Sequence, residues 1–410
     1  MLSVEEALNC MLDSVSQVGS ELIPLTAALG RVLAVDMAAP ADLPRFSHAT
    51  VDGFAIHSQD AEQASKGKRI PLKVIETVPA GSSCRGAVKP GVTIRVMTGA
   101  PLPPGAGAVV RDEDTSHGGK NTALVLLEKP VGPMENVARA GESVRRGDLV
   151  LRKGTTLRPG NIGVLASLGF RELKVFRRPE IAVLSTGSEL VDLGEGLSLG
   201  KIFASSFYVL LAKLRECGCT PVPLGVVGDE QDRIRERIRS GLVADGIITT
   251  GGTGHGGSDW VRPAYREMAV GRRVDGVAMS PGRSFVFGLL EGRPVFALPG
   301  SPSASIVTFE ELVKPVLLKM GGKRRDQGPN GRTVKIDLGG RVRGRNGVQR
   351  YVLSRIVVED GRLTAVPIAG EPRGSLGAVT YANGMIVLPA GESEVLPGQK
   401  VWARLFGLDI

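Results

Sequence analysis

Three carboxylates, each shortly after a different predicted strand, are the residues best suited to chemistry in this sequence. Glu189, Asp229 and Asp259 follow apolar runs that end in glycine or hydroxyl residues. Mg²⁺ takes oxygen ligands and often bridges phosphate groups, so three converging acids predict a magnesium site with catalytic carboxylates. For any single acid, a helix cap or first-turn charge is an equally good interpretation, and Asp229 and Asp259 are well placed for caps.

The turns at the same strand ends are rich in glycine and hydroxyl groups, which suits an anionic ligand. Glycine lets backbone N–H groups approach an anion, and a following helix N-terminus adds about half a positive charge. A phosphate of a nucleotide or a pterin is the expected guest. Each turn alone could be a plain strand exit, but four on one sheet edge favour a binding site. The candidate cofactor-binding residues here are Thr186, Gly187, Ser188, Gly251, Gly252, Thr253, Pro299, Gly300 and Ser301.

The segments that carry these turns alternate between strands and helices over residues 176–326. The expected strands are 181–185, 223–227, 246–250 and 295–298, and the expected helices are 205–217, 230–239 and 302–320. Such alternation predicts a central doubly wound parallel α/β domain with right-handed crossovers. In an open parallel sheet, ligands bind beyond the carboxyl ends of the strands, where the acids and turns fall.

The rest of the chain predicts further domains, so the fold class is multidomain α/β plus β. Short apolar runs split by Gly and Pro indicate an all-β insertion over residues 45–140, without a long helix. Residues 1–44 with 141–175 form an N-terminal and linker domain, whose first helix (3–18) starts with a capping-box pattern at Ser3 and Glu6. Residues 327–410 predict a small C-terminal β barrel.

Composition and charge narrow the class of partner. The chain has 410 residues, of which 42% are hydrophobic, so folded domains are favoured over disorder. The net charge of +9 favours anionic partners such as phosphates, oxyanions or nucleic acid. The longest basic run is Lys323-Arg324-Arg325, and no aromatic-interleaved basic motif occurs. A small anion is therefore favoured over nucleic acid, which stays as the third hypothesis.

The cysteines and the apolar segments bear on the compartment. Cys10, Cys84, Cys217 and Cys219 are too few for a disulfide scaffold, and Cys217-Gly218-Cys219 lacks the spacing of a zinc site. They indicate thiols in a reducing compartment. No targeting segment and no run of roughly 18 apolar residues occurs. We therefore expect a cytoplasmic protein without a membrane partner.

Eight short segments, in order along nearly the whole chain, resemble the molybdopterin molybdenumtransferase family, which includes the E domain of gephyrin. They are Val51-Asp52-Gly53-Phe54-Ala55, Met97-Thr98-Gly99-Ala100, Asn136 through Gly141-Glu142, Ser185-Thr186-Gly187-Ser188-Glu189-Leu190, Gly251-Gly252 with Asp259, Ser280-Pro281-Gly282-Arg283, Leu298-Pro299-Gly300-Ser301-Pro302 and Gly374-Ser375-Leu376. No single segment is decisive, but eight in family order make a chance resemblance very improbable.

The resemblance implies an activity in molybdenum cofactor biosynthesis. Members form elongated homodimers of four subdomains, and the active cleft lies between the pterin-binding α/β domain and parts of the partner subunit. Their substrate is adenylylated molybdopterin, whose pyrophosphate is cleaved with a divalent cation, here Mg²⁺, as molybdate is transferred to the dithiolene sulfurs and AMP is released. A molybdopterin adenylyltransferase is the protein partner that such a substrate suggests.

The resemblance also assigns roles to individual residues. Asp52 and Thr98 match cleft positions of the β insertion and are catalytic candidates, like the three acids. Arg350 and Ser375 match positions that contact the oxyanion, for which a guanidinium fork and an O–H donor are suited. The candidate contacts of the Pro-Gly segment are Pro281, Gly282 and Arg283.

The chain departs from the family pattern at several of these places. The family has a basic residue on either side of Pro-Gly and then Pro; here these positions are Ser280, Arg283 and Ser284. An Arg has become Ala138 and an Asp has become Ser143. Losing one charge-assisted hydrogen bond costs about 1.5–3 kcal/mol, or roughly ten- to a hundredfold in affinity. The alternative function is therefore a weakened or non-catalytic paralogue that binds molybdopterin as a carrier or regulator, or one that prefers tungstate.

Two histidines near these segments leave a further choice open. His48 precedes Asp52, and His255 lies between the glycine turn and Asp259. A solvated loop histidine is the favoured interpretation of each. A new contact to an oxyanion or a metal is the alternative.

Overall fold

The computed structural model forms two compact units. It describes residues 1–65, 68–117, 123–254, 259–323, 332–359, 361–368 and 376–406. Unit 1 comprises Met1–Val35, Gly154–Arg158 and Glu172–Ile410, and unit 2 comprises Asp36–Lys153 and Pro159–Arg171. The predicted α/β and C-terminal segments belong to unit 1 and the predicted β insertion to unit 2; the finer division into four domains stays a prediction.

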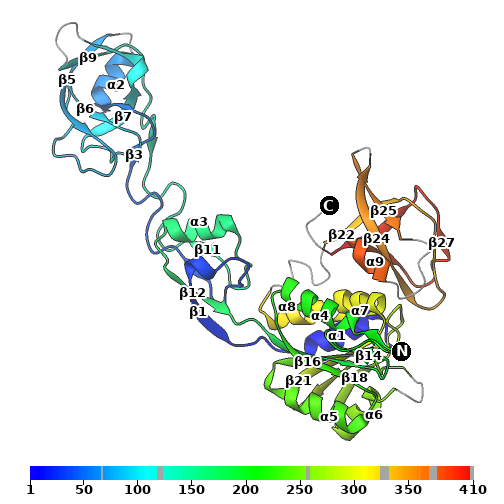
Figure 1. Cartoon of the computed structure of the whole chain (residues 1–410). Helices are drawn as coiled ribbons and strands as arrows, with labels where there is room; N and C mark the ends of the chain where they lie inside the picture. Colours follow the sequence, from blue (N-terminus) through cyan, green and yellow to red (C-terminus); the bar gives the residue numbers. More distant parts are fainter. Residues whose placement is uncertain are drawn as a thin grey trace. The chain divides into compact units, whose positions relative to one another are not determined.

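A six-stranded sheet forms the centre of unit 1 (Figure 1). Its strands, in spatial order, are β16 (Thr220–Val227), β13 (Glu180–Thr186), β17 (Gly246–Thr250), β21 (Arg293–Leu298), β20 (Val286–Leu290) and β18 (Gly271–Asp275). The first four are parallel, which confirms the predicted α/β sheet. β20 runs antiparallel to both of its neighbours, β21 and β18, and neither β20 nor β18 was predicted from the sequence.

Helices cover both faces of this sheet. One face carries α1 (Val4–Asp13), α4 (Ser205–Glu216), α7 (Pro302–Thr308), the π-helical turn η4 (Phe309–Val313) and α8 (Lys314–Met320); the other carries α5 (Gln231–Ser240) and α6 (Val261–Glu267) (Figure 1). Alternate residues of β13 serve the two cores: Ile181 and Val183 join the α1/α4 side, and Ala182 and Leu184 the α5/α6 side. Burial on both faces explains why the central residues 181–184 of this strand are all apolar.

The first helix begins at the predicted capping box. The backbone N–H of Glu6 donates to Ser3 Oγ, and the N–H of Ser3 donates to Glu6 Oε2. The helix ends at Asp13, earlier than the predicted residue 18. Val15 nevertheless stays buried in the core, which accounts for the apolar pattern that extended the prediction.

The C-terminal segment of unit 1 forms a small closed barrel, as predicted. Its strands are β22 (Arg332–Leu338), β23 (Val342–Arg343), β24 (Gln349–Glu359), β25 (Arg362–Pro367), β26 (Gly384–Leu388), β27 (Glu394–Val395) and β28 (Lys400–Leu405), with helix α9 (Leu376–Tyr381). Pairing of β24 with β26 closes the sheet. The α/β part adds β19 (Met279–Ser280), which runs parallel to β24 and sets Ser280 opposite Arg350.

Unit 2 is built on a second six-stranded sheet. Its strands are β7 (Ala106–Arg111), β4 (Gly53–His57), β6 (Val92–Val96), β5 (Ile70–Val78), β9 (Leu124–Leu127) and β8 (Thr115–His117). The expectation of an all-β insertion was incomplete, because α2 (Ser58–Ser65) packs onto this sheet. Ala61 and Ala64, three residues apart, are buried in its core, and this short spacing was missed in the sequence.

Smaller elements complete the two units. In unit 1 these are η1 (Leu25–Ala27), η3 (Gly241–Val243) and the strand pairs β1 (Ser20–Pro24) with β12 (Glu172–Phe176) and β14 (Leu190–Val191) with β15 (Ile202–Phe203). In unit 2 they are η2 (Asp112–Asp114), α3 (Pro159–Ser167) and the pairs β2 (Met37–Ala38) with β11 (Leu149–Leu151) and β3 (His48–Ala49) with β10 (Val137–Ala138).

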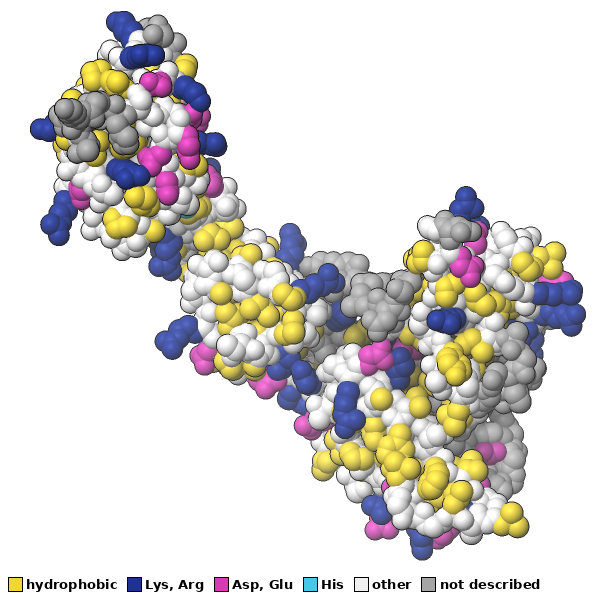
Figure 2. All heavy atoms as spheres, turned by 45° about the horizontal axis from the view of Figure 1, so that its top comes forward, with side chains coloured by type: hydrophobic (Ala, Val, Ile, Leu, Met, Phe, Trp, Pro, Cys, Tyr) yellow, Lys and Arg dark blue, Asp and Glu magenta, His cyan; other side chains and the backbone are white. Residues whose placement is uncertain are grey.

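The surface is mixed in character. On the face shown in Figure 2, Lys and Arg side chains are spread among acidic ones rather than gathered into one patch. Within the described ranges, no helix combines the length and the apolar character that crossing a bilayer requires.

Candidate functional site

A pocket of about 440 Å³ lies at the carboxyl ends of β13, β17 and β21, and we call it the strand-end pocket. Its lining residues are Thr186, Gly187, Glu189, Asp229, Gly251, Gly252, Thr253, Gly254, Asp259, Ser284, Pro299, Gly300 and Ser301. The structure therefore brings all three predicted acids and almost all predicted turn residues to one place. Ser188 is not in this lining, but its neighbours on both sides are.

Two glycines allow the end of β17 to pass against the end of β13. Gly251 has a φ of +96°, and a Cβ there would stand 2.1 Å from the carbonyl oxygen of Thr186. Gly252 has a φ of +59°, and a Cβ there would stand 3.0 Å from Thr186 Oγ1. Only glycine tolerates both the positive φ and the close approach. The Thr186 hydroxyl is buried and finds no hydrogen-bond partner within the described residues, so it is available to a ligand in this pocket.

Asp229 and Ser188 hold two strand ends together by reciprocal hydrogen bonds. The backbone N–H of Ser188 donates to Asp229 Oδ2 over 2.9 Å, and the N–H of Asp229 donates to Ser188 Oγ over 3.1 Å. One oxygen of Asp229 is thus engaged with the backbone of Ser188. Asp229 does not cap α5, whose N-cap residue is Glu230, so the helix-cap interpretation of this acid is wrong. Lys201 adds a bond from its Nζ to the carbonyl of Ser188 at 2.5 Å.

The carboxylates of Glu189 and Asp259 each lie against a glycine of the pocket. A Cβ on Gly187 would stand 2.7 Å from Glu189 Oε2, and a Cβ on Gly254 would stand 2.6 Å from Asp259 Oδ2. Glycine at these positions therefore leaves room for both carboxylates. His255 and the rest of residues 255–258 lie outside the described residues.

The donor set bears on the predicted magnesium site. Among the described residues, no group of three His, Cys, Asp or Glu side chains lies close enough to hold a metal ion. Mg²⁺, however, is commonly held by one or two carboxylates together with substrate phosphates and water. Carboxylates of Glu189, Asp229 and Asp259 around one pocket fit that mode, and they do not form a complete protein cage.

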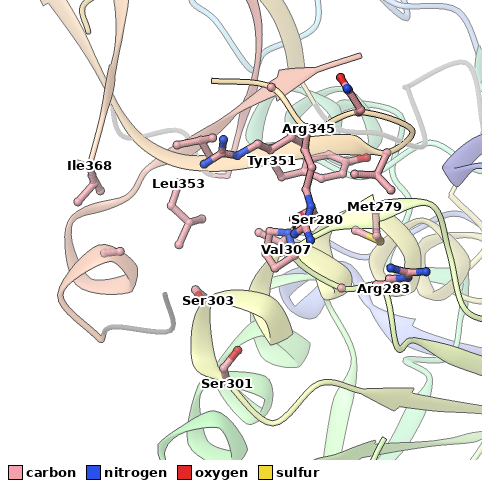
Figure 3. A pocket seen from close by; sticks show the side chains of 18 residues that line it. Met279, Ser280, Arg283, Ser301, Ser303, Val307, Arg345, Tyr351, Leu353 and Ile368 are labelled. Atoms are coloured by element: carbon pink, nitrogen blue, oxygen red, sulfur yellow. Dashed lines mark hydrogen bonds between the residues drawn. The ribbon is translucent and has the colours of Figure 1, made fainter. Parts of the chain in front are cut away.

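A second and larger cavity, of about 820 Å³, lies where the barrel meets the α/β part; we call it the arginine cavity (Figure 3). It is lined by Met279, Ser280, Pro281, Gly282, Arg283, Ser301, Ser303, Val307, Gly344, Arg345, Asn346, Val348, Arg350, Tyr351, Val352, Leu353, Ile368 and Ala378. The predicted residues Pro281, Gly282, Arg283 and Arg350 are all here. Ser301 lines both this cavity and the strand-end pocket, so the two are neighbours.

Backbone geometry shapes the wall of this cavity. Gly282 has a φ of +113°, and a Cβ there would stand 2.5 Å from Thr308 Cγ2 of α7. Arg350 donates a hydrogen bond from Nη1 to the carbonyl oxygen of Arg343. This bond holds the Arg350 guanidinium at the cavity wall. Ser375, the other predicted oxyanion contact, lies outside the described residues.

The two cleft residues of unit 2 form a bonded pair. Asp52 Oδ1 accepts hydrogen bonds from the backbone N–H of Thr98 at 2.7 Å and from Thr98 Oγ1 at 2.8 Å. These bonds, the backbone one first, hold the pKa of Asp52 below its ordinary value. His48 makes a 3.3 Å contact from Nδ1 to the carbonyl of Phe46 and an edge contact with the Phe46 ring. His48 lies half-buried on the short strand β3, opposite Ala138 of β10, so the expected solvated loop position is not what the structure shows.

Sequence reasoning missed some residues of both sites. Ser284, treated only as a loss of proline, lines the strand-end pocket and shares a 3.0 Å hydrogen bond with Thr253 Oγ1. Arg262 of α6 was not singled out, yet its Nε donates to the Thr253 carbonyl at 2.8 Å and fixes this turn. Arg345 lines the arginine cavity, and the alternating basic pattern at 341, 343 and 345 is the signal that could have drawn attention to it.

Family models match three consecutive parts of the chain. The MoeA N-terminal region (domain I and II) matches residues 2–169, a probable molybdopterin binding domain matches residues 182–319, and the MoeA C-terminal region (domain IV) matches residues 335–406. The second of these ranges contains every residue that lines the strand-end pocket. It begins at Ala182, two residues after the start of β13.

Individual relatives agree with this assignment. A molybdopterin molybdenumtransferase of Staphylococcus epidermidis is 32% identical over 391 residues, 95% of this chain and 92% of its own length. One of Staphylococcus aureus is 35% identical over 325 residues, 78% of this chain and 76% of its own length. The crystal structure of the molybdopterin biosynthesis moeA protein from Pyrococcus horikoshii OT3 superposes with a TM-score of 0.85 at 30% identity, over 99% of this chain and all of that one.

A doubly wound α/β domain with an acid-lined strand-end pocket and a docked barrel thus defines the class. The chain belongs to the molybdopterin molybdenumtransferase family. The predicted transferase class and the predicted place in molybdenum cofactor biosynthesis are confirmed at this level.

Proposed function

We propose that the chain catalyses Mg²⁺-dependent insertion of molybdate into adenylylated molybdopterin with release of AMP. The observation that carries this proposal is the meeting of Glu189, Asp229 and Asp259 in the strand-end pocket, next to a cavity lined by arginines. A phosphate-bearing pterin needs the first kind of site, and an oxyanion needs the second. The shared residue Ser301 supports a single site with two compartments.

The strand-end pocket is suited to the pyrophosphate of the substrate. The turn at Gly251 and Gly252 can approach phosphate oxygens because it lacks side chains, and the α7 N-terminus at Ser301 and Pro302 adds its dipole. One or two of the carboxylates of Glu189, Asp229 and Asp259 would hold Mg²⁺ together with substrate phosphates, and the ion would supply positive charge to the phosphate oxygens. In this compartment water would attack one phosphorus of the pyrophosphate, so that the P–O–P link breaks, AMP leaves and the pterin keeps its own phosphate.

The arginine cavity is suited to the tetrahedral oxyanion. Its described lining contains arginines and hydroxyl groups and no Asp or Glu, so its field favours an anion. Arg350 and Arg283 are the guanidinium groups in our assignment, with Ser375 as a further hydroxyl donor. Asp52 and Thr98 of unit 2 complete the set of catalytic candidates through their match to family positions.

The wider context of the proposal follows from family membership. We infer that the chain acts in the cytoplasm as an elongated homodimer of four-domain subunits, and that a molybdopterin adenylyltransferase supplies its substrate. The proposed domains are 1–44 with 141–175, 45–140, 176–326 and 327–410. Cross-linking and light scattering of the purified protein test the homodimer directly.

The central experiment is a turnover assay. The protein is incubated with adenylylated molybdopterin, Mg²⁺ and either molybdate or tungstate, and AMP and active cofactor are measured. We expect AMP release that requires Mg²⁺ and falls at least a hundredfold in Glu189→Gln, as removal of a catalytic carboxylate entails. Glu230→Gln is the matched control, because Glu230 is a nearby exposed acid that pairs with Arg233 and does not line the pocket.

Two other outcomes of this assay would support the alternative functions. Tight pterin binding without AMP release would support the carrier or regulator, the alternative that the changes at Ala138, Ser143, Ser280 and Ser284 suggest. Faster product formation with tungstate than with molybdate would assign the chain to tungsten instead.

A further inference from the structure

Arg345 reaches across the arginine cavity to the α/β part of unit 1. It lies in the loop between β23 and β24, and its Nη1 donates to Ser280 Oγ over 3.3 Å, although 65 residues separate the two in sequence. Figure 3 shows its side chain extending toward Ser280 at the cavity wall. Ser280 in turn stands opposite Arg350 in the β19–β24 pair. The three residues thus form one corner of the cavity.

The charge of Arg345 is not compensated by an acidic side chain among the described residues. Arg341 and Arg343, which precede Arg345 in the alternating series, both pair with Glu394. Arg345 pairs with no acid among the described residues, and neither does Arg283 on the adjoining wall. Arg345 is itself exposed, and its guanidinium donates to the neutral hydroxyl of Ser280 at the wall of the cavity.

The hydroxyl of Ser280 is well matched to this arrangement. A serine hydroxyl carries two acceptor lone pairs and one O–H donor. Its oxygen accepts from Arg345, so the hydroxyl proton stays free to donate to a further acceptor. At this contact the two side chains therefore offer donors: the remaining N–H groups of Arg345 and the O–H of Ser280. Such a set recognises an acceptor-only ligand such as a tetrahedral oxyanion.

We propose that Arg345 is an oxyanion-binding residue and that Ser280 positions its guanidinium. This inference rests on the proposed function, since it assigns the cation that the substrate oxyanion meets at the place where the resemblance led us to expect a lysine. The charge that Ser280 cannot provide comes from the barrel instead of from the Pro-Gly turn. Arginine at this position offers a planar fork of donors where lysine offers a point charge.

The test uses the full chain and sodium molybdate alone, without the pterin. Isothermal titration calorimetry measures the Kd of molybdate for the wild type, Arg345→Ala, Arg345→Lys and Ser280→Lys/Arg345→Ala. We expect Arg345→Ala to weaken binding roughly ten- to a hundredfold, the loss of one charge-assisted contact. Arg345→Lys recovers part of the affinity, and Ser280→Lys/Arg345→Ala recovers it by returning a cation to the same corner.

Controls separate this inference from the proposed function. Arg341→Ala removes an equal charge from a residue that pairs with Glu394 and does not line the cavity, and it leaves the Kd within about twofold, because surface charges act weakly at a distance. Wild-type turnover with an unchanged molybdate Kd and KM in Arg345→Ala overturns the role of Arg345 and leaves the function standing. Molybdate binding that depends on Arg345, without any AMP release, supports the role of Arg345 and contradicts the proposed function. A wild type that binds no molybdate overturns the inference as well.

Discussion

The Tyr351 hydroxyl donates a hydrogen bond to Glu311 Oε2 over 3.0 Å, and this contact joins the barrel to the helical layer of the α/β sheet. Tyr351 follows Arg350 on β24, and Glu311 lies in the π-helical turn η4. Arg404 of β28 places Nη1 2.9 Å from the other carboxylate oxygen. All three side chains are buried, so the wall of the arginine cavity is anchored by a polar cluster.

Removing the Tyr351 hydroxyl is expected to destabilise unit 1. Tyr351→Phe leaves a buried oxygen of Glu311 without its donor, which costs about 1–3 kcal/mol of unfolding free energy. The measurement is urea unfolding followed by circular dichroism. Tyr208→Phe is the matched control, because the Tyr208 hydroxyl also donates to a carboxylate, that of Asp192, but at the surface. Equal losses in the two variants would contradict a special role for the buried contact.

The same cluster predicts a pH dependence of stability. Burial, together with the like charge of Glu310, raises the pKa of Glu311 to about 7. The positive charge of Arg404 and the hydrogen bond from Tyr351 lower the pKa but only in part offset the burial. A carboxyl whose folded pKa is raised stabilises the fold at low pH, and this stability is lost as the pH rises from about 4.5 through 7.

Unfolding at pH 5 and pH 8 checks this dependence against Glu311→Gln, which cannot ionise. The variant is less stable in absolute terms, because Arg404 loses its partner. Between the two pH values, however, the wild type loses up to roughly 3 kcal/mol relative to the variant. Glu5→Gln, on the exposed side of α1, is the control and follows the wild type. Parallel wild-type and Glu311→Gln profiles would show that Glu311 does not titrate in this range.

The features that could be predicted from the sequence are those whose signals lie close together along the chain. The turn at Gly251 and Gly252 follows a buried strand directly, and strand, turn and helix signals lie within a few residues of one another. The parallel order then brings the predicted acids to one sheet edge without any further information. This is why the strand-end pocket could be anticipated from Glu189, Asp229 and Asp259.

What the sequence did not reveal depends on distant contacts. Arg345 acquires its meaning only when the barrel docks and brings it to Ser280. Glu310 and Glu311 fall in a segment predicted as one helix, where acids are normally solvated, but here they pair with Lys213 of α4 and Arg404 of β28. Strands β20 and β18 extend the edge of the sheet through antiparallel pairing with distant segments, which no local sequence pattern indicates.

The glycine at the end of β17 is expected to be irreplaceable. In Gly251→Ala, the residue keeps a positive φ at a cost of about 1–2 kcal/mol, and the new Cβ meets the Thr186 carbonyl, which adds roughly 1–3 kcal/mol. Gly194→Ala isolates the first cost, because Gly194 has a φ of +91° and nothing within 4 Å of a Cβ. Urea midpoints of the two variants measure the difference, and identical midpoints would mean that the β17 exit relaxes freely.

The final prediction concerns the bonded pair of unit 2. Asp52 is exposed, and the two hydrogen bonds from Thr98 lower its pKa. The bond from the backbone N–H has the larger effect, and the bond from the hydroxyl the smaller. Thr98→Ala removes the hydroxyl and keeps the backbone N–H. The pKa of Asp52 should therefore rise toward, but not reach, its ordinary value of 3.8. Titration of the aspartate carboxyl carbons by ¹³C NMR follows this directly. Thr98→Ser retains an O–H donor and should titrate as the wild type does. If both variants raised the pKa equally, the γ-methyl group and not the hydroxyl would be what holds Asp52 in its bonded geometry.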